Sequence, residues 1–155
     1  MWVVTERWHD QGGYEPPRRL QRLPTWLAGQ LAKKGELLVG EALAHEGARR
    51  PHFAVLTSLA EQGAASQAAL GRRLWIDRSD LHALLAELEQ DGSVARARDE
   101  LDRRRNVVTL TRAGARALGR LDTLIDAAQD ALLRPLSAAE QRELRRLLQK
   151  VLSAG

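Results

Sequence analysis

The apolar residues change their spacing at Gly92, and this change limits the folds that the chain can adopt. Ahead of Gly92, leucines recur every three or four residues, which is the spacing of a buried helix face. Beyond it, Val94 and Ala95 begin a short strand and residues 107–110 form another, with the charged residues 99–105 as the hairpin tip. The pattern predicts a mainly α-helical protein of the α+β class with one small β-hairpin.

Two short helices are expected just before this hairpin. Ser66 is the predicted cap of the first and Asp77 of the second, because serine and aspartate side chains accept hydrogen bonds from free amides at a helix start. Only about three residues separate the two helices, which is the spacing of a helix-turn-helix. A long helix is predicted to follow the hairpin from Thr111, and a last helix to follow a capping box at Ser137.

These elements divide the chain into three kinds of segment. Residues 51–110 are predicted to form a winged helix-turn-helix, with the hairpin as its wing. Residues 1–22 contain paired glycines and prolines and are expected to be an irregular N-terminal arm. Residues 23–50 and 111–153 form helices whose apolar stripes the small central domain cannot wholly cover. We expect these helices to pack against a second copy in a two-fold dimer; a helical bundle within one chain is the alternative.

Composition removes several function classes. The chain has no cysteine, so disulfides and thiolate metal sites are excluded. Its four histidines lack the close spacing of a zinc-binding helix, and no phosphate-binding loop or nucleophile motif is present, so we expect no metal, no cofactor and no enzyme. A metal site of histidine and carboxylate ligands is the alternative. No apolar run approaches the ~20 residues of a membrane span, and the N-terminus lacks the apolar core of a signal peptide. The chain is expected to be cytoplasmic.

The positive charge is concentrated in one segment. The chain carries a net charge of +4, and residues 96–116 contain seven arginines against three acidic residues, so this segment alone accounts for the excess. A local cationic patch on a neutral body is typical of a surface that binds a polyanion. A solubilising arginine-rich loop is the alternative that charge by itself leaves open.

The second helix of the helix-turn-helix supplies the first candidate DNA contacts. Its N-terminal residues lie nearest to the base edges when such a helix enters the major groove. Here these residues are Arg78, Ser79, Asp80 and His82. Arg78 and Ser79 can bond to phosphate or base, and Asp80 could accept from a cytosine amino group. A helix-capping role for Asp80 and a solvent-facing His82 are the alternatives.

The hairpin supplies the second set of candidate contacts. An arginine at the end of a thin loop can enter the minor groove, where negative potential is concentrated. The candidates are Arg103, Arg104 and Arg105, with Asp102 close enough to orient one guanidinium. Arg96, Arg98 or Arg112 are expected to add phosphate contacts, which raise affinity without reading sequence.

Four stretches of the chain are similar to the MarR family of bacterial transcription regulators. They are Ser66-Gln-Ala-Ala-Leu, Ile76-Asp-Arg-Ser, Leu88-Glu-Gln-Asp-Gly and Asp102-Arg-Arg-Arg-Asn-Val-Val-Thr-Leu-Thr-Arg-Ala-Gly114. The resemblance runs from about Leu23 to Leu152 and keeps the order of elements. It implies a triangular homodimer on double-stranded DNA with a pseudo-palindromic operator, recognition helices in successive major grooves and wings in the flanking minor grooves.

The resemblance also assigns roles to single residues. Arg104 corresponds to the wing arginine, Asp102 to the aspartate that supports it, and Arg78 and Ser79 to the start of the recognition helix. Trp75 stands between the two helices, where the family usually has glycine, a residue that suits the left-handed end of a helix. A bulky residue takes that conformation only with strain; packing against a neighbour or a place near a ligand are the alternatives for Trp75.

A small-molecule effector is a further implication of the resemblance. Many MarR-like proteins release DNA when a small, often anionic aromatic compound binds between the DNA-binding lobe and the dimer helices. The residues best placed to line such a site are Trp26, Gln30, His45 and His52. Each has a structural alternative: Trp26 as core packing, Gln30 and His45 as solvent-facing residues, and His52 as a first-turn helix residue.

The sequence thus predicts a sequence-specific DNA-binding regulator, with repression as the default of the family. The rival interpretation is a winged helix that serves as a protein-interaction module, because a fold does not determine a function. The arginine-rich wing favours DNA, since an interaction module has no need for it.

Overall fold

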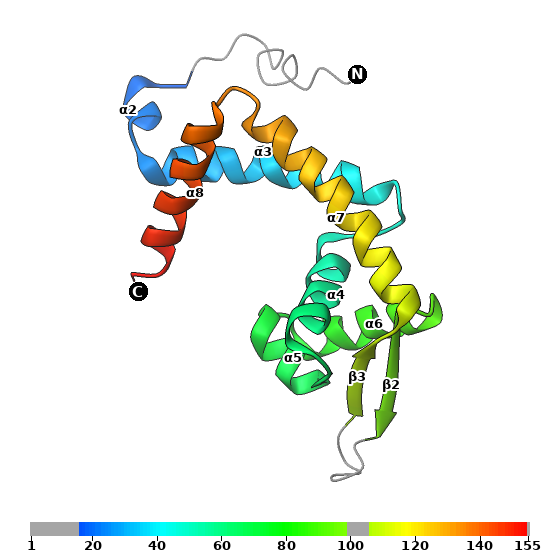
Figure 1. The fold of residues 1–155 in the computed structure, drawn as a ribbon. Coiled ribbons are helices and arrows are strands. Elements are labelled where there is room, and N and C mark those ends of the chain that lie inside the picture. The colour runs from blue at the N-terminus through cyan, green and yellow to red at the C-terminus, as the bar shows by residue number, and fades with distance from the viewer. Residues whose placement is uncertain (1–15, 99–105, 155) are drawn as a thin grey trace. The chain divides into compact units, whose positions relative to one another are not determined.

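A computed structural model describes residues 16–98 and 106–154 (Figure 1). The helices are α2 (Arg18–Gln21), α3 (Pro24–Ala44), α4 (Arg50–Gln62), α5 (Gln67–Leu74), α6 (Arg78–Gln90), α7 (Arg112–Leu133) and α8 (Ala138–Leu152). The strands are β1 (Ala65–Ser66), β2 (Val94–Arg98) and β3 (Asn106–Leu110). The mainly helical fold with a small antiparallel hairpin confirms the predicted fold class.

The described residues fall into two compact units, the first ending at Glu36 and the second beginning at Leu37. Within the first unit, α2 is a single helical turn inside the segment that the sequence predicted to be irregular up to residue 22. Pro16 and Pro17 precede it, and the Gln21 side-chain amide donates to the Pro16 carbonyl at 2.6 Å. Arg18 to Gln21 favour helix, so a short turn forms once the prolines end.

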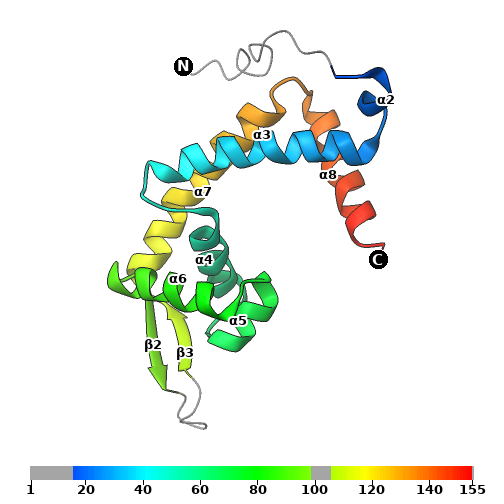
Figure 2. The same ribbon diagram turned by 180° about the vertical axis from the view of Figure 1, so that it is seen from behind.

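The core of the second unit is built around α4, which packs against α5, α6, α7 and β3 (Figure 2). Leucine and valine side chains fill it, and the largest of them are almost wholly inaccessible to solvent. These fully buried residues are Leu43, Val55, Leu56, Leu70, Leu81, Leu85, Leu88 and Val108. The apolar stripes predicted for α4, α5 and α6 therefore face one common interior.

The sheet has three strands in the order β1–β3–β2, all antiparallel. Val94 pairs with Leu110 and Arg98 with Asn106, so β2 and β3 form the two sides of the predicted wing. The tip of the wing, residues 99–105, lies outside the described residues. Strand β1 was not predicted, because it has two residues, the second of which is the helix cap Ser66, and two residues are too few to show an alternating pattern.

The helix caps predicted at Ser66, Asp77, Thr111 and Ser137 are confirmed. Ser66 Oγ accepts from the Ala69 amide at 3.2 Å, and Asp77 Oδ1 accepts from the Ser79 amide at 2.8 Å. The Thr111 hydroxyl accepts from the Gly114 amide at 2.9 Å at the start of α7. Ser137 and Glu140 form the reciprocal capping box of α8. Each of these residues caps the start of a helix where the sequence placed it.

Trp75, between α5 and α6, has the left-handed conformation, with φ of 54° and ψ of 38°. It is the one residue other than glycine with positive φ in the described ranges. A bulky side chain in this conformation costs about 1–3 kcal/mol. The side chain is 94% exposed, so the packing alternative for Trp75 is not met by the described part of the chain.

Candidate nucleic-acid interface

One face of helix α6 packs in the core, and the opposite face is exposed to solvent. Leu81, Leu84, Leu85 and Leu88 are buried in the core. The residues predicted to meet DNA lie between and ahead of these leucines and are all exposed. They are Arg78, Ser79, Asp80 and His82. Because burial is confined to the leucine face, the polar start of the helix is free to enter a groove.

The start of α6 is stabilised by Asp77. Its carboxylate accepts from both the backbone amide and the hydroxyl of Ser79, the latter at 2.5 Å. The Ser79 hydroxyl, and then its amide, hold the pKa of Asp77 below its ordinary value. Ser79 is thereby oriented at the helix start. Asp80 lies in the first turn, where a carboxylate is favourable to the helix dipole.

Acid should weaken this cap. The pKa of Asp77 is lowered in the fold, so its contribution to stability is present above the unfolded pKa of about 4 and is lost as the pH falls through the folded value. Asparagine also caps helices but does not titrate. We expect urea unfolding midpoints of the wild type and Asp77→Asn to converge as the pH is lowered from 6 to about 3. If the difference between the two midpoints stays constant over this pH range, the assignment of the Asp77 carboxylate as the cap is wrong.

The base of the wing is attached to α6 through an ion pair. Arg96 on β2 donates through Nε to Glu89 Oε2 at 2.9 Å, and the arginine holds the pKa of Glu89 below its usual range. Arg96 was predicted as a phosphate contact, and in this structure its guanidinium is held by Glu89. Arg98 is exposed at the end of β2. Arg96 therefore orients the hairpin, while Arg98 is left as the more accessible cation.

The remaining wing candidates lie outside the described residues. These are Asp102, Arg103, Arg104 and Arg105. The two strands that lead to them are described and paired through their full length. Their proposed contact with the minor groove stays a prediction.

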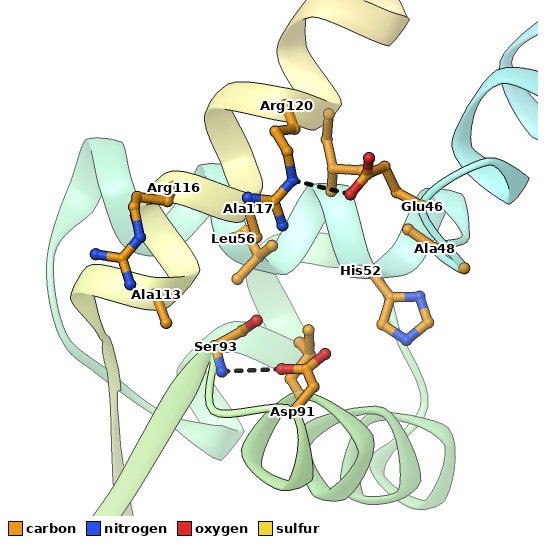
Figure 3. Close-up of a pocket in the computed structure, with 13 residues that line it drawn as sticks. Glu46, Ala48, His52, Leu56, Asp91, Ser93, Ala113, Arg116, Ala117 and Arg120 are labelled. Carbon is orange, nitrogen blue, oxygen red and sulfur yellow. Dashed lines mark hydrogen bonds and ion pairs between the residues drawn. The ribbon is translucent and has the colours of Figure 1, made fainter.

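A pocket of about 350 Å³ lies elsewhere in the second unit, lined from α4, α7, the loop after α3 and the end of α6 (Figure 3). Arg120 on α7 donates to Glu46 at 2.9 Å across it. The Asp91 carboxylate accepts from the Ser93 amide at 2.9 Å. Arg116 lines the pocket one helical turn before Arg120 and has no hydrogen bond or ion pair with any described residue. The pocket thus offers one unpaired arginine and one that is shared with Glu46.

His52 is a buried polar residue of this pocket. Its Nδ1 accepts from the Arg49 amide at 3.0 Å, so the ring proton is on Nε2, which donates to Glu87 at 2.9 Å. Arg49 also donates to Glu87, at 2.7 Å. Arg49 and then His52 hold the pKa of Glu87 below its ordinary value. These bonds join the start of α4 to α6 and fix the ring at the wall of the pocket.

Of the four residues predicted to line an effector site, His52 lines this pocket. His45 is exposed just after α3. Trp26 and Gln30 lie half-buried on the part of α3 that belongs to the first unit. Sequence reasoning missed Arg116 and Arg120, although their spacing of four residues places them on one helix face. The spacing shows that the two arginines share one face of α7, but it does not show which elements that face contacts.

Two classes of site are absent from residues 16–98 and 106–154. No helix in these ranges combines the length and apolarity of a membrane span. No group of histidine and acidic side chains in the same ranges has the arrangement of a metal site.

Comparison with known proteins gives a consistent result. A family model described as MarR family matches residues 47–105. The HTH-type transcriptional repressor Rv2887 of Mycobacterium tuberculosis is 32% identical over 113 residues, which are 73% of this chain and 81% of that protein. The similarity is therefore not confined to the helix-turn-helix.

Solved structures extend the similarity to the fold. The PcaV transcriptional regulator from Streptomyces coelicolor, in complex with its natural ligand, has a TM-score of 0.73 and 30% identity, over 90% of this chain and 99% of PcaV. A MarR variant from E. coli complexed with operator DNA has a TM-score of 0.73 and 27% identity, over 88% of this chain and 99% of that one. The similarity to each of these structures thus extends over most of this chain and nearly all of the other chain.

Proposed function

The chain belongs to the MarR family of transcription regulators, and from this premise we propose that it is a sequence-specific, DNA-binding repressor that a small anionic ligand releases from its operator. The observation that carries the DNA-binding part is the start of α6. Four exposed polar residues project there from a helix whose opposite face is buried and whose first turn is capped by Asp77. A similar regulator, the MarR variant, was solved with operator DNA.

A dimer is part of the proposal. Helix α8 has no buried residue, and several of its apolar side chains are exposed to solvent. Leu147 and Leu148 are 45% and 42% exposed, Val151 is 75% exposed and Leu152 is 83% exposed. An apolar stripe of this size is typical of an interface, and a two-fold pair of chains would present two recognition helices to a pseudo-palindromic site.

The test is DNA binding by the purified protein. Fluorescence anisotropy with the DNA upstream of the chain's own gene should give saturable binding that weakens steeply with salt, because bound phosphates release counterions. Light scattering should give the mass of a dimer. A strict monomer, or a protein that ignores every duplex at low salt, would remove the proposal. A protein-interaction module, the rival function, would leave the duplex unbound while remaining folded.

The pocket beside α7 is the proposed effector site. The Arg116 guanidinium has no partner in residues 16–98 and 106–154 and can receive a carboxylate, and the apolar side chains of Leu56, Leu88 and Leu121 can contact an aromatic ring. A carboxylate that also reaches Arg120 would compete with Glu46 for it. Loss of that ion pair would loosen the end of α3 from α7, which couples ligand binding to the placement of the DNA-binding elements.

Hydroxybenzoates are the probe for this site. At a ligand concentration of 100 times Kd, we expect the wild type to gain about 2.7 kcal/mol of stability and a higher Tm. Arg116→Ala should bind about tenfold more weakly, since a charge-assisted hydrogen bond is lost. Arg134→Ala, an exposed residue just after α7, is the control and should respond like the wild type. Intact DNA binding without any thermal shift would remove the effector proposal alone.

A further inference from the structure

Neither the backbone conformation nor the packing of the described residues requires a tryptophan at position 75. Its backbone is in the left-handed region, where the described chain otherwise places Gly47, Gly63 and Gly92. Its amide donates to the Gly71 carbonyl and ends α5, a bond that glycine could make equally well. The indole packs on nothing in the described structure, being 94% exposed. Neither the backbone nor the core therefore accounts for a tryptophan here.

The surface around Trp75 is cationic. Arg72 and Arg73 lie in the last turn of α5, and Arg78 is the first residue of α6; all three are exposed. Two acidic residues lie near them: Asp77 uses its carboxylate to cap α6, and Asp80 lies in the first turn of that helix, so the three arginines still exceed the acidic charge. An aromatic side chain set among arginines matches the sugar and phosphate surface of DNA, where apolar sugar faces alternate with negative charge.

The position of Trp75 in the helix-turn-helix points to the same partner. It precedes Arg78 by three residues, so the two Cα atoms are separated by no more than about 11 Å. When the first turn of α6 lies at the base edges, the connection between α5 and α6 (Figure 2) lies at the rim of the same groove. A sugar-phosphate backbone borders that rim.

We propose that Trp75 is a DNA-contact residue that packs its indole on the sugar-phosphate backbone beside the major groove. The indole Nε1–H, a donor, can bond to a phosphate oxygen. This inference rests on the proposed DNA-binding function and adds to it a contact outside the recognition helix. Self-association through this surface is disfavoured, because a two-fold contact would place Arg72, Arg73 and Arg78 against their own copies.

The test compares Trp75→Gly with the wild type on the same duplex. Glycine adopts the left-handed conformation freely, so the variant should unfold at the same urea concentration as the wild type or a higher one. Its affinity for DNA should fall by about fivefold, which is the loss expected for one buried apolar contact. The tryptophan fluorescence change on DNA binding should shrink in the variant, because the contacting indole is gone.

Two further measurements keep the outcomes separate. Trp75→Phe keeps a ring without the N–H donor and should bind with intermediate affinity. Wild-type affinity for Trp75→Gly would overturn the proposal while leaving the DNA-binding function intact. Unchanged affinity with an altered mass by light scattering would overturn it in favour of a protein contact. Absence of DNA binding by the wild type itself would instead remove the proposed function.

Discussion

Gly114→Ala is expected to lower the free energy of unfolding by about 3 kcal/mol, which corresponds to a fall in Tm of roughly 6–12 °C for a chain of this size. Gly114 is buried in the first turn of α7. A Cβ atom added there would lie 2.0 Å from the Ser93 carbonyl oxygen and 2.7 Å from Leu110 Cδ1. The nearest obstacle is backbone, so the chain must shift rather than rotate a side chain.

The shift would affect the base of the wing. The Ser93 carbonyl also accepts from the Thr111 amide at 3.1 Å, which joins the start of β2 to the start of α7. Any displacement of Ser93 therefore disturbs a contact that sets where the hairpin leaves the domain. Urea unfolding followed by circular dichroism would measure the loss of stability, and DNA affinity should fall with it.

Gly119→Ala is the matched control on the same helix. No described atom lies within 4 Å of the Cβ that this substitution would add. Glycine inside a helix costs about 0.5–1 kcal/mol relative to alanine, so this variant should be slightly more stable than the wild type. The same substitution is thus expected to lower the free energy of unfolding at position 114 and to raise it at position 119, five residues later. Similar effects at the two positions would show that helix propensity, and not the close approach to Ser93, determines the change in stability.

Arg78→Ala is expected to weaken operator binding by about tenfold or more, because an arginine at a base edge or phosphate is worth about 1–3 kcal/mol. Arg78 is the first residue of α6, is exposed and has no bond to another described side chain. Its loss should therefore leave the folded state unchanged and act on the complex. Fluorescence anisotropy across a salt series measures both the affinity and its salt dependence.

The salt series also separates the two kinds of contact. If Arg78 binds a phosphate, the slope of affinity against salt should fall by about one and all sequences should weaken equally; if it reads a base, discrimination at one position should relax. Arg134→Ala is the control and removes the same charge. Arg134 follows the C-terminal end of α7, about 33 Å along that helix from the wing, so its loss should change the DNA affinity little. Equal losses from the two variants would contradict the role of Arg78.

Many local features could be predicted because the groups that make them are close in sequence. The caps at Ser66, Asp77, Thr111 and Ser137 each join residues two or three apart. The same holds for the wing, whose paired strands lie on either side of one loop. Strand β1 escaped prediction because its partner, β3, is about forty residues away and its own two residues show no period.

The hydrogen-bond partners of individual side chains could not be predicted when the partners are far apart in sequence. Arg120 and Glu46 are 74 positions apart, and His52 and Glu87 are 35 apart, so no sequence pattern predicted either pair. Arg96 was predicted to be free for phosphate, and its bond to Glu89 appears only when β2 lies beside α6. The pocket that includes Arg116 likewise forms only once α7 packs on α4.

By itself, the sequence determined where α5, α6, α7 and α8 begin, which of the helix faces in the core are apolar and where the wing arises, because hydrogen bonds and periodicity within a few residues decide these features. The tertiary structure decided which charges are paired, that the Trp75 side chain is exposed, and that Gly114 has no room for a Cβ. These properties follow from the packing of segments distant in sequence, where a close approach of a few tenths of an ångström changes what a side chain can contact.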